Sequence, residues 1–140
     1  MQNFNLHTHS IYSDGKSQPR EIVEDAIRQD LTTLGFSEHS PLPFDNTFSV
    51  KSADMPRYIA EIAHLKEEFK DQIDIYCALE ADYLTGVSES FAVTKEKYHL
   101  DYLAVSSTAV ACSDFIDTRP AVNAKKPNAT WNSFILFSSK

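Results

Sequence analysis

The chain has 140 residues, of which 42% are apolar and 11% aromatic, which is enough to bury the core of one domain and argues against intrinsic disorder. Its formal net charge of −7 argues against binding nucleic acid or anionic lipid by charge, because phosphate binding needs a basic patch. The sequence has no apolar run long enough to span a membrane and no targeting signal at its start. We therefore expect a cytoplasmic protein with no nucleic-acid partner and no membrane partner.

The two cysteines, Cys77 and Cys112, lie far apart and form no Cys-x-x-Cys pair. Two isolated cysteines fit a protein of a reducing compartment, so we expect no disulfide bond between them.

Short apolar runs and helical repeats alternate along the first 106 residues. The expected elements are a strand at 4–6, a helix of about four turns from Pro19, a strand at 34–37, a helix at 55–69, a strand at 73–79, a helix at 89–97 and a strand at 102–105. This order predicts a parallel sheet with right-handed crossovers. Four such units are about half of a barrel of ~250 residues. The predicted fold class is therefore α/β, a partial, distorted β/α barrel of about four strand-helix units with parallel strands.

The character of the sequence changes near residue 106. Residues 1–106 carry 18 acidic and 9 basic residues, whereas residues 107–140 carry 2 acidic and 4 basic residues, with only a possible short strand at 134–137. We therefore divide the chain into a domain at 1–106 and an atypical tail at 107–140. Without a further strand, the fourth strand would leave an exposed sheet edge that is open to self-association.

The pair His7-x-His9, followed by Asp14, is the sharpest chemical feature of the sequence. Alternate residues of a strand share one face, so two imidazoles at this spacing can bind the same metal ion. A single His-x-His pair is weak evidence for a metal site, so the residues at the ends of the neighbouring strands must be considered with it.

His39 and Glu80 come at the ends of the next two expected strands, where parallel pairing would bring them to the first pair. Imidazole and carboxylate together suit zinc, iron or manganese, and a carboxylate can bridge two divalent metal ions. We expect the metal ligands to be His7, His9, Asp14, His39 and Glu80. Asp82 is a candidate for a supporting hydrogen bond or, equally, a solvated carboxylate.

Two other histidines are expected to play no part in the site. His64 falls opposite the apolar face of its helix, and His99 precedes the fourth strand, at the wrong end of the sheet.

Three segments, 7–15 (HTHSIYSDG), 37–39 (SEH) and 79–83 (LEADY), resemble the N-terminal half of the polymerase-and-histidinol-phosphatase (PHP) domain. Within that family, the SPLPF loop at 40–44 and the YIAEI helix at 58–62 most resemble the histidinol-phosphatases. The resemblance covers about residues 3–106.

The resemblance implies a distorted barrel that hydrolyses a small-molecule phosphate monoester, L-histidinol phosphate, in histidine biosynthesis. By this analogy, His7, His9 and Glu80 hold one metal ion, Glu80 bridges to a second, and Asp14 and His39 hold a third. Clustered cations neutralise the phosphate and activate water, so the nucleophile would come from water and no catalytic side chain is assigned.

The sequence also departs from the family pattern. Thr108 stands where the family has a histidine after its fourth strand, and every histidine of this chain lies at or before position 99. The later histidine and aspartate ligands and the phosphate-binding arginines have no counterpart, Arg119 being the one arginine of the tail. We therefore expect a truncated member with an incomplete second metal site.

The sequence leaves two alternatives open. One is a catalytically inactive metal-binding fragment that needs a partner chain to complete its barrel. The other is another metal hydrolase, such as a nuclease of the amidohydrolase type, which also has His-x-His on its first strand.

Overall fold

The computed structural model describes residues 3–82, 91–106 and 133–137. The elements in these ranges, in chain order, are β1 (Phe4–Thr8), α1 (Pro19–Arg28), β2 (Thr33–His39), α2 (Met55–Glu68), β3 (Asp74–Asp82), α3 (Phe91–Tyr98), β4 (Tyr102–Ser106) and β5 (Ser133–Phe137). None of the helices in these ranges has the length and apolar character that crossing a membrane would require.

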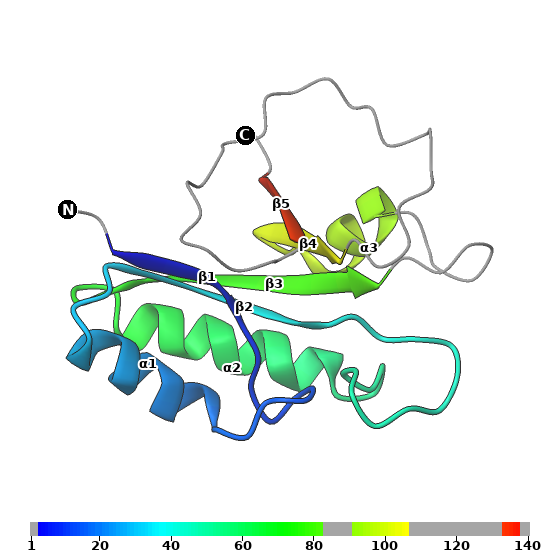
Figure 1. The fold of residues 1–140 in the computed structure, drawn as a ribbon, viewed down its shortest axis with the longest axis horizontal. Helices are drawn as coiled ribbons and strands as arrows, with labels where there is room; N and C mark the ends of the chain where they lie inside the picture. The colour runs from blue at the N-terminus through cyan, green and yellow to red at the C-terminus, as the bar shows by residue number, and fades with distance from the viewer. Residues whose placement is uncertain (1–2, 83–90, 107–132, 138–140) are drawn as a thin grey trace.

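The strands form one sheet in the order β1-β2-β3-β4-β5. The first four strands pair in parallel, and β5 pairs antiparallel with β4 (Figure 1). Four parallel strands that alternate with helices in an unclosed sheet confirm the predicted fold class. The edge of β4 is thus covered by β5, which contains the short strand expected at 134–137.

Helices α1 and α2 lie side by side against the same face of the sheet (Figure 1). Their apolar residues face β2 and β3, so the core lies between the helices and these two central strands. Met55, Ile62 and Phe69 are buried as the helical spacing predicts. Tyr58 is also fully buried, and its hydroxyl lies 2.7 Å from the carbonyl oxygen of Ala78, which fastens α2 to β3.

Helix α1 is shorter than the predicted four turns, because it ends at Arg28 after ten residues. Asp30 adopts a left-handed conformation with φ of 57°. The amide of Leu31 then donates a hydrogen bond to the carbonyl oxygen of Ala26 at 3.0 Å. These are features of a Schellman motif, which ends a helix and satisfies its last carbonyl groups. The chain turns into β2 one turn earlier than the apolar pattern indicates.

The sheet is strongly curled, as the side chain of Tyr102 shows. Its hydroxyl donates a hydrogen bond of 2.6 Å from β4 to the carbonyl oxygen of Leu6 in β1. Three steps between neighbouring strands of a flat sheet would separate these strands by about 14 Å, further than a tyrosine reaches. Gly35 of β2 makes room for the ring, because a Cβ atom there would lie 2.0 Å from the Tyr102 hydroxyl. The curl turns the ends of β1, β2 and β3 towards one another, so side chains from these three strands can meet.

Replacing Gly35 by alanine should therefore destabilise the fold, because the new methyl group would push the Tyr102 ring out of its place. Overpacking of this kind costs about 1–3 kcal/mol of unfolding free energy, which urea denaturation measures. In a Gly35→Ala, Tyr102→Phe double variant, removing the hydroxyl should recover part of that loss. Fully additive losses would show that the two side chains do not compete for the same space.

Candidate metal centre

Strand β1 delivers two imidazoles to one side of the sheet. His7 lies in β1 and His9 follows its last residue, so the alternation of an extended chain turns both side chains the same way. Their rings stack with centroids 5.0 Å apart, and the side chains are 26% and 15% exposed. This arrangement leaves the two rings half-buried but open to a small ligand.

Glu80 of β3 lies at the centre of a cluster that also contains His7, His9 and His39. Its side chain is 7% exposed, and its Oε2 atom lies 3.3 Å from Nε2 of His7 and 3.1 Å from Nε2 of His9. The same oxygen lies 3.7 Å from Nδ1 of His39. His39 ends β2 and pairs in register with Glu80, which explains why these two side chains meet. One carboxylate oxygen therefore faces three imidazoles.

Asp14 reaches the cluster from the loop between β1 and α1. Its Oδ1 atom lies 2.7 Å from Nδ1 of His9, and its Oδ2 atom lies 3.6 Å from Nε2 of His39. The loop doubles back so tightly that a Cβ atom on Gly15 would lie 2.3 Å from the carbonyl oxygen of His9. The glycine thus permits the turn that places Asp14 beside His9.

The five predicted ligands form two groups that share His9. In the first group, His7, His9 and Glu80 each offer a ligand atom, and these atoms lie within 4.8 Å of one another. His9, Asp14 and His39 form the second group by the same measure. All five predicted side chains therefore come together at one end of the parallel strands.

The contacts of His9 test whether a cation would fit. Nε2 of His9 is buried and has no hydrogen-bond partner among the described residues, although a Glu80 oxygen lies near it. A buried nitrogen without a partner is costly, and a metal ion bound by both groups would satisfy it. The other nitrogen, Nδ1, contacts Asp14, and such a second contact orients a ligating histidine. The residues present fit a divalent cation.

Charge pairing shifts the protonation of the cluster in the absence of metal. Burial lowers the pKa of His9, but the carboxylates of Glu80 and Asp14 outweigh it and raise the pKa to about 9. Burial raises the pKa of Glu80, but His7 and His9 outweigh it and lower the pKa to about 2. The pKa of Asp14 is also lowered, since its contact with His9 outweighs its burial. The metal-free cluster therefore holds a proton where a cation would bind, and a metal ion would displace it.

The histidines that we expected outside the site do lie elsewhere. The side chain of His64 is 73% exposed and lies 3.5 Å from Glu68 on the same helix. His99 is exposed in a left-handed turn after α3. The positions of Thr108, Arg119 and Cys112 and the side chain of Asp82 lie outside the described part of the chain, so the expectations for them stay predictions. Cys77 is not in a disulfide, and burial raises the pKa of its thiol to about 12.

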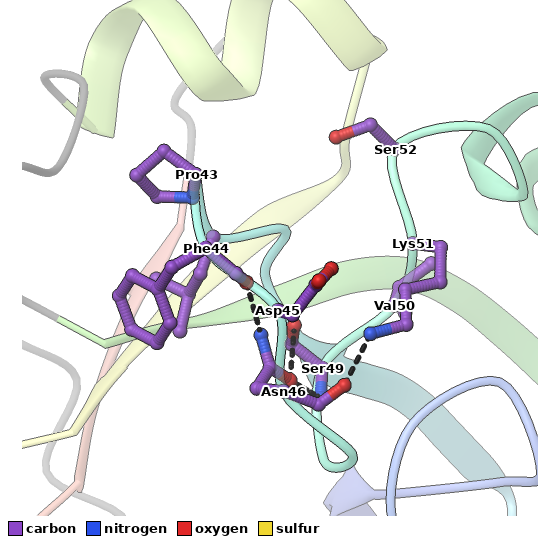
Figure 2. Close-up of a pocket in the computed structure, with 9 residues that line it drawn as sticks. Pro43, Phe44, Asp45, Asn46, Ser49, Val50, Lys51 and Ser52 are labelled. Carbon is purple, nitrogen blue, oxygen red and sulfur yellow. Dashed lines mark hydrogen bonds between the residues drawn. The ribbon is translucent and has the colours of Figure 1, made fainter.

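The long loop between β2 and α2 carries no predicted ligand, yet it lies beside the cluster. The loop lines an open hollow of about 610 Å³, and none of the residues that line it belongs to the imidazole cluster. Figure 2 shows Asn46 among the residues that line this hollow. Its side chain donates a hydrogen bond to the carbonyl oxygen of Phe44 and accepts one from the hydroxyl of Ser49. The ring of Phe48 meets the ring of His39 edge-on, with centroids 5.5 Å apart. The loop therefore packs against the rim of the cluster through an aromatic residue.

The role of Glu38, like that of the loop between β2 and α2, was not predicted from the sequence. Its side chain is fully buried and bonded to Ser10 and Ser13 in the loop after β1. A carboxylate next to His39, in a strand that is otherwise apolar or small, was the available signal.

The sequence of this chain is similar to one protein family and to several of its members. The family model described as the PHP domain matches residues 5–135. A "probable histidinol-phosphatase" of Deinococcus radiodurans is 31% identical over 100 residues, covering 70% of this chain and 38% of its own. The histidinol-phosphatase of Bacillus subtilis is 30% identical over 107 residues, covering 70% of this chain and 40% of its own.

A solved structure shares the fold. The histidinol phosphate phosphatase of Lactococcus lactis, in complex with zinc, L-histidinol and phosphate, aligns with a TM-score of 0.58 and 28% identity. The alignment covers 79% of this chain and 41% of that one. This chain thus spans about 40% of the length of the relatives described here.

The pKa values predict how the stability of the metal-free chain depends on pH. The pKa of His9 is raised from 6.5 to about 9, so its contribution is complete below pH 6.5 and is lost as the pH rises through about 9. The pKa of Glu80 is lowered from 4.5 to about 2, so its contribution is present above pH 4.5 and is lost as the pH falls through about 2. Urea unfolding in the presence of a chelator should therefore show falling stability between pH 6.5 and 9. That fall should vanish in His9→Gln but persist in His64→Gln, and an unchanged fall in His9→Gln would mean that another group causes it.

Proposed function

This chain belongs to the PHP domain family, and from this we propose that its imidazole and carboxylate cluster binds divalent metal ions and serves the hydrolysis of a phosphate monoester. The observation that carries the proposal is the position of Glu80, one oxygen of which lies within 3.1–3.7 Å of three imidazole nitrogens. The buried Nε2 of His9 supports it, because this nitrogen lies 3.1 Å from a Glu80 oxygen but makes no hydrogen bond to the described residues. The resemblance seen in the sequence is confirmed at the level of the family.

We assign the ligands by the two groups that the side chains form. His7, His9 and Glu80 would hold one ion, and Asp14 with His39 would hold another. The carboxylate of Glu80 is near enough to His39 to bridge towards a further ion. Imidazole and carboxylate donors suit zinc, iron and manganese, and the Lactococcus lactis relative was crystallised with zinc.

Bound divalent ions would neutralise the charge of a phosphate and lower the pKa of water. The side chains of this chain would hold these ions and orient one another as ligands. Asp14 holds Nδ1 of His9, so that Nε2 faces Glu80. In the reaction a water oxygen bonds to phosphorus, the bond from phosphorus to the ester oxygen breaks, and the alcohol leaves with a proton. Asp14 is half-exposed, so the cluster is accessible to a small anionic substrate.

We propose L-histidinol phosphate as the substrate and histidine biosynthesis as the context. The support comes from the relatives, which are named histidinol-phosphatases, and from the Lactococcus lactis structure with L-histidinol and phosphate. The match to the PHP domain favours this reaction over an amidohydrolase-type nuclease.

A second candidate function is metal binding by a subunit that is active only with a partner chain. The open sheet favours it, because β1 and β5 are edges of the sheet and the described ligands come from its first three strands and the loops between them. Gel filtration with light scattering measures whether the chain associates with itself.

Loss of His9 should abolish tight metal binding, because this residue belongs to both ligand groups. We expect His9→Ala to reduce the affinity for Zn²⁺ at least a hundredfold in calorimetric titration. His64→Ala, the matched control on an exposed helix face, should leave the affinity unchanged. Equal losses in the two variants would mean that the ligand assignment is wrong.

Phosphate release separates the two functions. Release of phosphate from L-histidinol phosphate by the chain supplied with zinc, iron or manganese, and loss of that release in His9→Ala, would support the hydrolase. Zinc binding without any release would favour the subunit that needs a partner. A chain that binds no metal and releases no phosphate would overturn both functions, and cleavage of single-stranded DNA without activity on phosphate monoesters would favour a nuclease.

A further inference from the structure

We propose that Glu38 is a positioning residue of the metal centre, which holds the loop after β1 so that Asp14 faces His39. This inference rests on the proposed function, because it concerns how the metal ligands of that site are placed. Glu38 is not one of the proposed ligands, and its role would be exerted through the residues beside it.

Among the described residues, the side chain of Glu38 forms its hydrogen bonds with the loop between β1 and α1. Its Oε1 and Oε2 atoms accept hydrogen bonds from the backbone amide of Ser10 at 2.9 and 3.0 Å. The hydroxyl of Ser10 donates to Oε1 at 2.5 Å, and the hydroxyl of Ser13 donates to Oε2. The carboxylate is fully buried, so its bonds are shielded from competing water.

Each partner in this arrangement is the immediate neighbour of a proposed ligand in the chain. Ser10 follows His9, Ser13 precedes Asp14, and Glu38 precedes His39. The hydrogen bonds of Glu38 therefore hold both ends of the segment from His9 to Asp14 close to β2. This segment has no regular secondary structure of its own beyond a turn, so its position depends on such bonds.

The chemistry of the side chain makes the arrangement specific. A carboxylate accepts hydrogen bonds at both oxygens, which suits the amide and hydroxyl groups that point at Glu38. Glutamine has the same shape but would place an NH₂ group against one of these donors. A buried carboxylate also costs desolvation energy that an apolar residue would avoid, and such residues are most often found at functional sites.

The effect should be stronger on one ligand group than on the other. His7 and Glu80 lie within β1 and β3, where backbone pairing with β2 holds them. Asp14 is half-exposed and lies in the loop, which the Glu38 bonds hold to β2 and the Tyr12 hydroxyl holds to Glu61 of α2, so its place depends more on such side-chain bonds. We therefore expect loss of Glu38 to weaken the site formed by Asp14 and His39 more than the site formed by His7, His9 and Glu80, in which only His9 adjoins the loop.

Calorimetric titration of the full chain with Zn²⁺ alone tests this selectivity, with Asp14→Ala and His7→Ala as references for the two sites. Glu38→Gln should lower the affinity of the site that Asp14→Ala removes by about 10–100-fold, the usual effect of losing a residue that orients metal ligands. The affinity of the site that His7→Ala weakens should change by a clearly smaller factor.

A matched control separates positioning from a general loss of stability. Tyr58→Phe removes another buried hydrogen-bonding hydroxyl, which lies 2.7 Å from the carbonyl oxygen of Ala78 in β3. The variant keeps the ring of residue 58, and with it the ring contact to Tyr12 of the loop. It should lower the unfolding free energy by about 1 kcal/mol or more, as lost buried hydrogen bonds do, and leave both zinc affinities unchanged. Ser13→Ala, which keeps Glu38, should weaken the same site as Glu38→Gln by a smaller factor and gives the answer if Glu38→Gln does not fold.

The outcomes are distinguishable. If the unsubstituted chain binds no Zn²⁺, the proposed function fails and the role of Glu38 fails with it. If the unsubstituted chain binds Zn²⁺ but Glu38→Gln and Ser13→Ala bind it as Tyr58→Phe does, the positioning role is wrong and the proposed function stands. Equal weakening of both zinc sites in Glu38→Gln would show a structural role and would also overturn the inference.

Discussion

The structure depends on one electrostatic constraint, the approach of a Glu80 oxygen to the imidazoles of His7, His9 and His39. These side chains come from three neighbouring strands, and they meet because β2 and β3 pair with His39 opposite Glu80. A slip of one residue in this register would turn Glu80 to the other face of the sheet. Such a slip would leave a carboxylate among the apolar residues of the core. The packing of the core and the geometry of the cluster therefore require the same register.

The curl of the sheet is the second requirement. In a flat sheet β1 and β3 would stand about 10 Å apart, and their side chains would point in parallel rather than converge. Tyr102 holds the curl by reaching from β4 to β1, and Gly35 leaves the space for its ring. A residue far from the cluster in the sequence thus contributes to the convergence of the proposed ligands.

Two buried carboxylates, Glu80 and Glu38, lie at this end of the sheet and have different contacts. Glu80 and His9 form the centre of the cluster, with pKa values that move in opposite directions because each stabilises the charged form of the other. Glu38, the chain neighbour of His39, accepts hydrogen bonds from Ser10 and Ser13 of the loop after β1. Buried carboxylates lower the stability of a fold unless hydrogen bonds or cations compensate them, so their concentration at this end of the sheet supports a function that uses them.

The sequence by itself determined the alternation of strands and helices and the five candidate ligands. Both rest on local rules: apolar spacing reports which face a segment buries, and a histidine pair one residue apart in a strand must share a side. The structure alone showed the end of α1 at Arg28, the antiparallel pairing of β5, the hydrogen bond of Tyr102 to Leu6 and the contacts of Glu38. The last three join residues that are 25 or more positions apart, and such contacts depend on the register and curl of the whole sheet. The early end of α1 depends on an aspartate in a left-handed conformation, which local apolar spacing does not report.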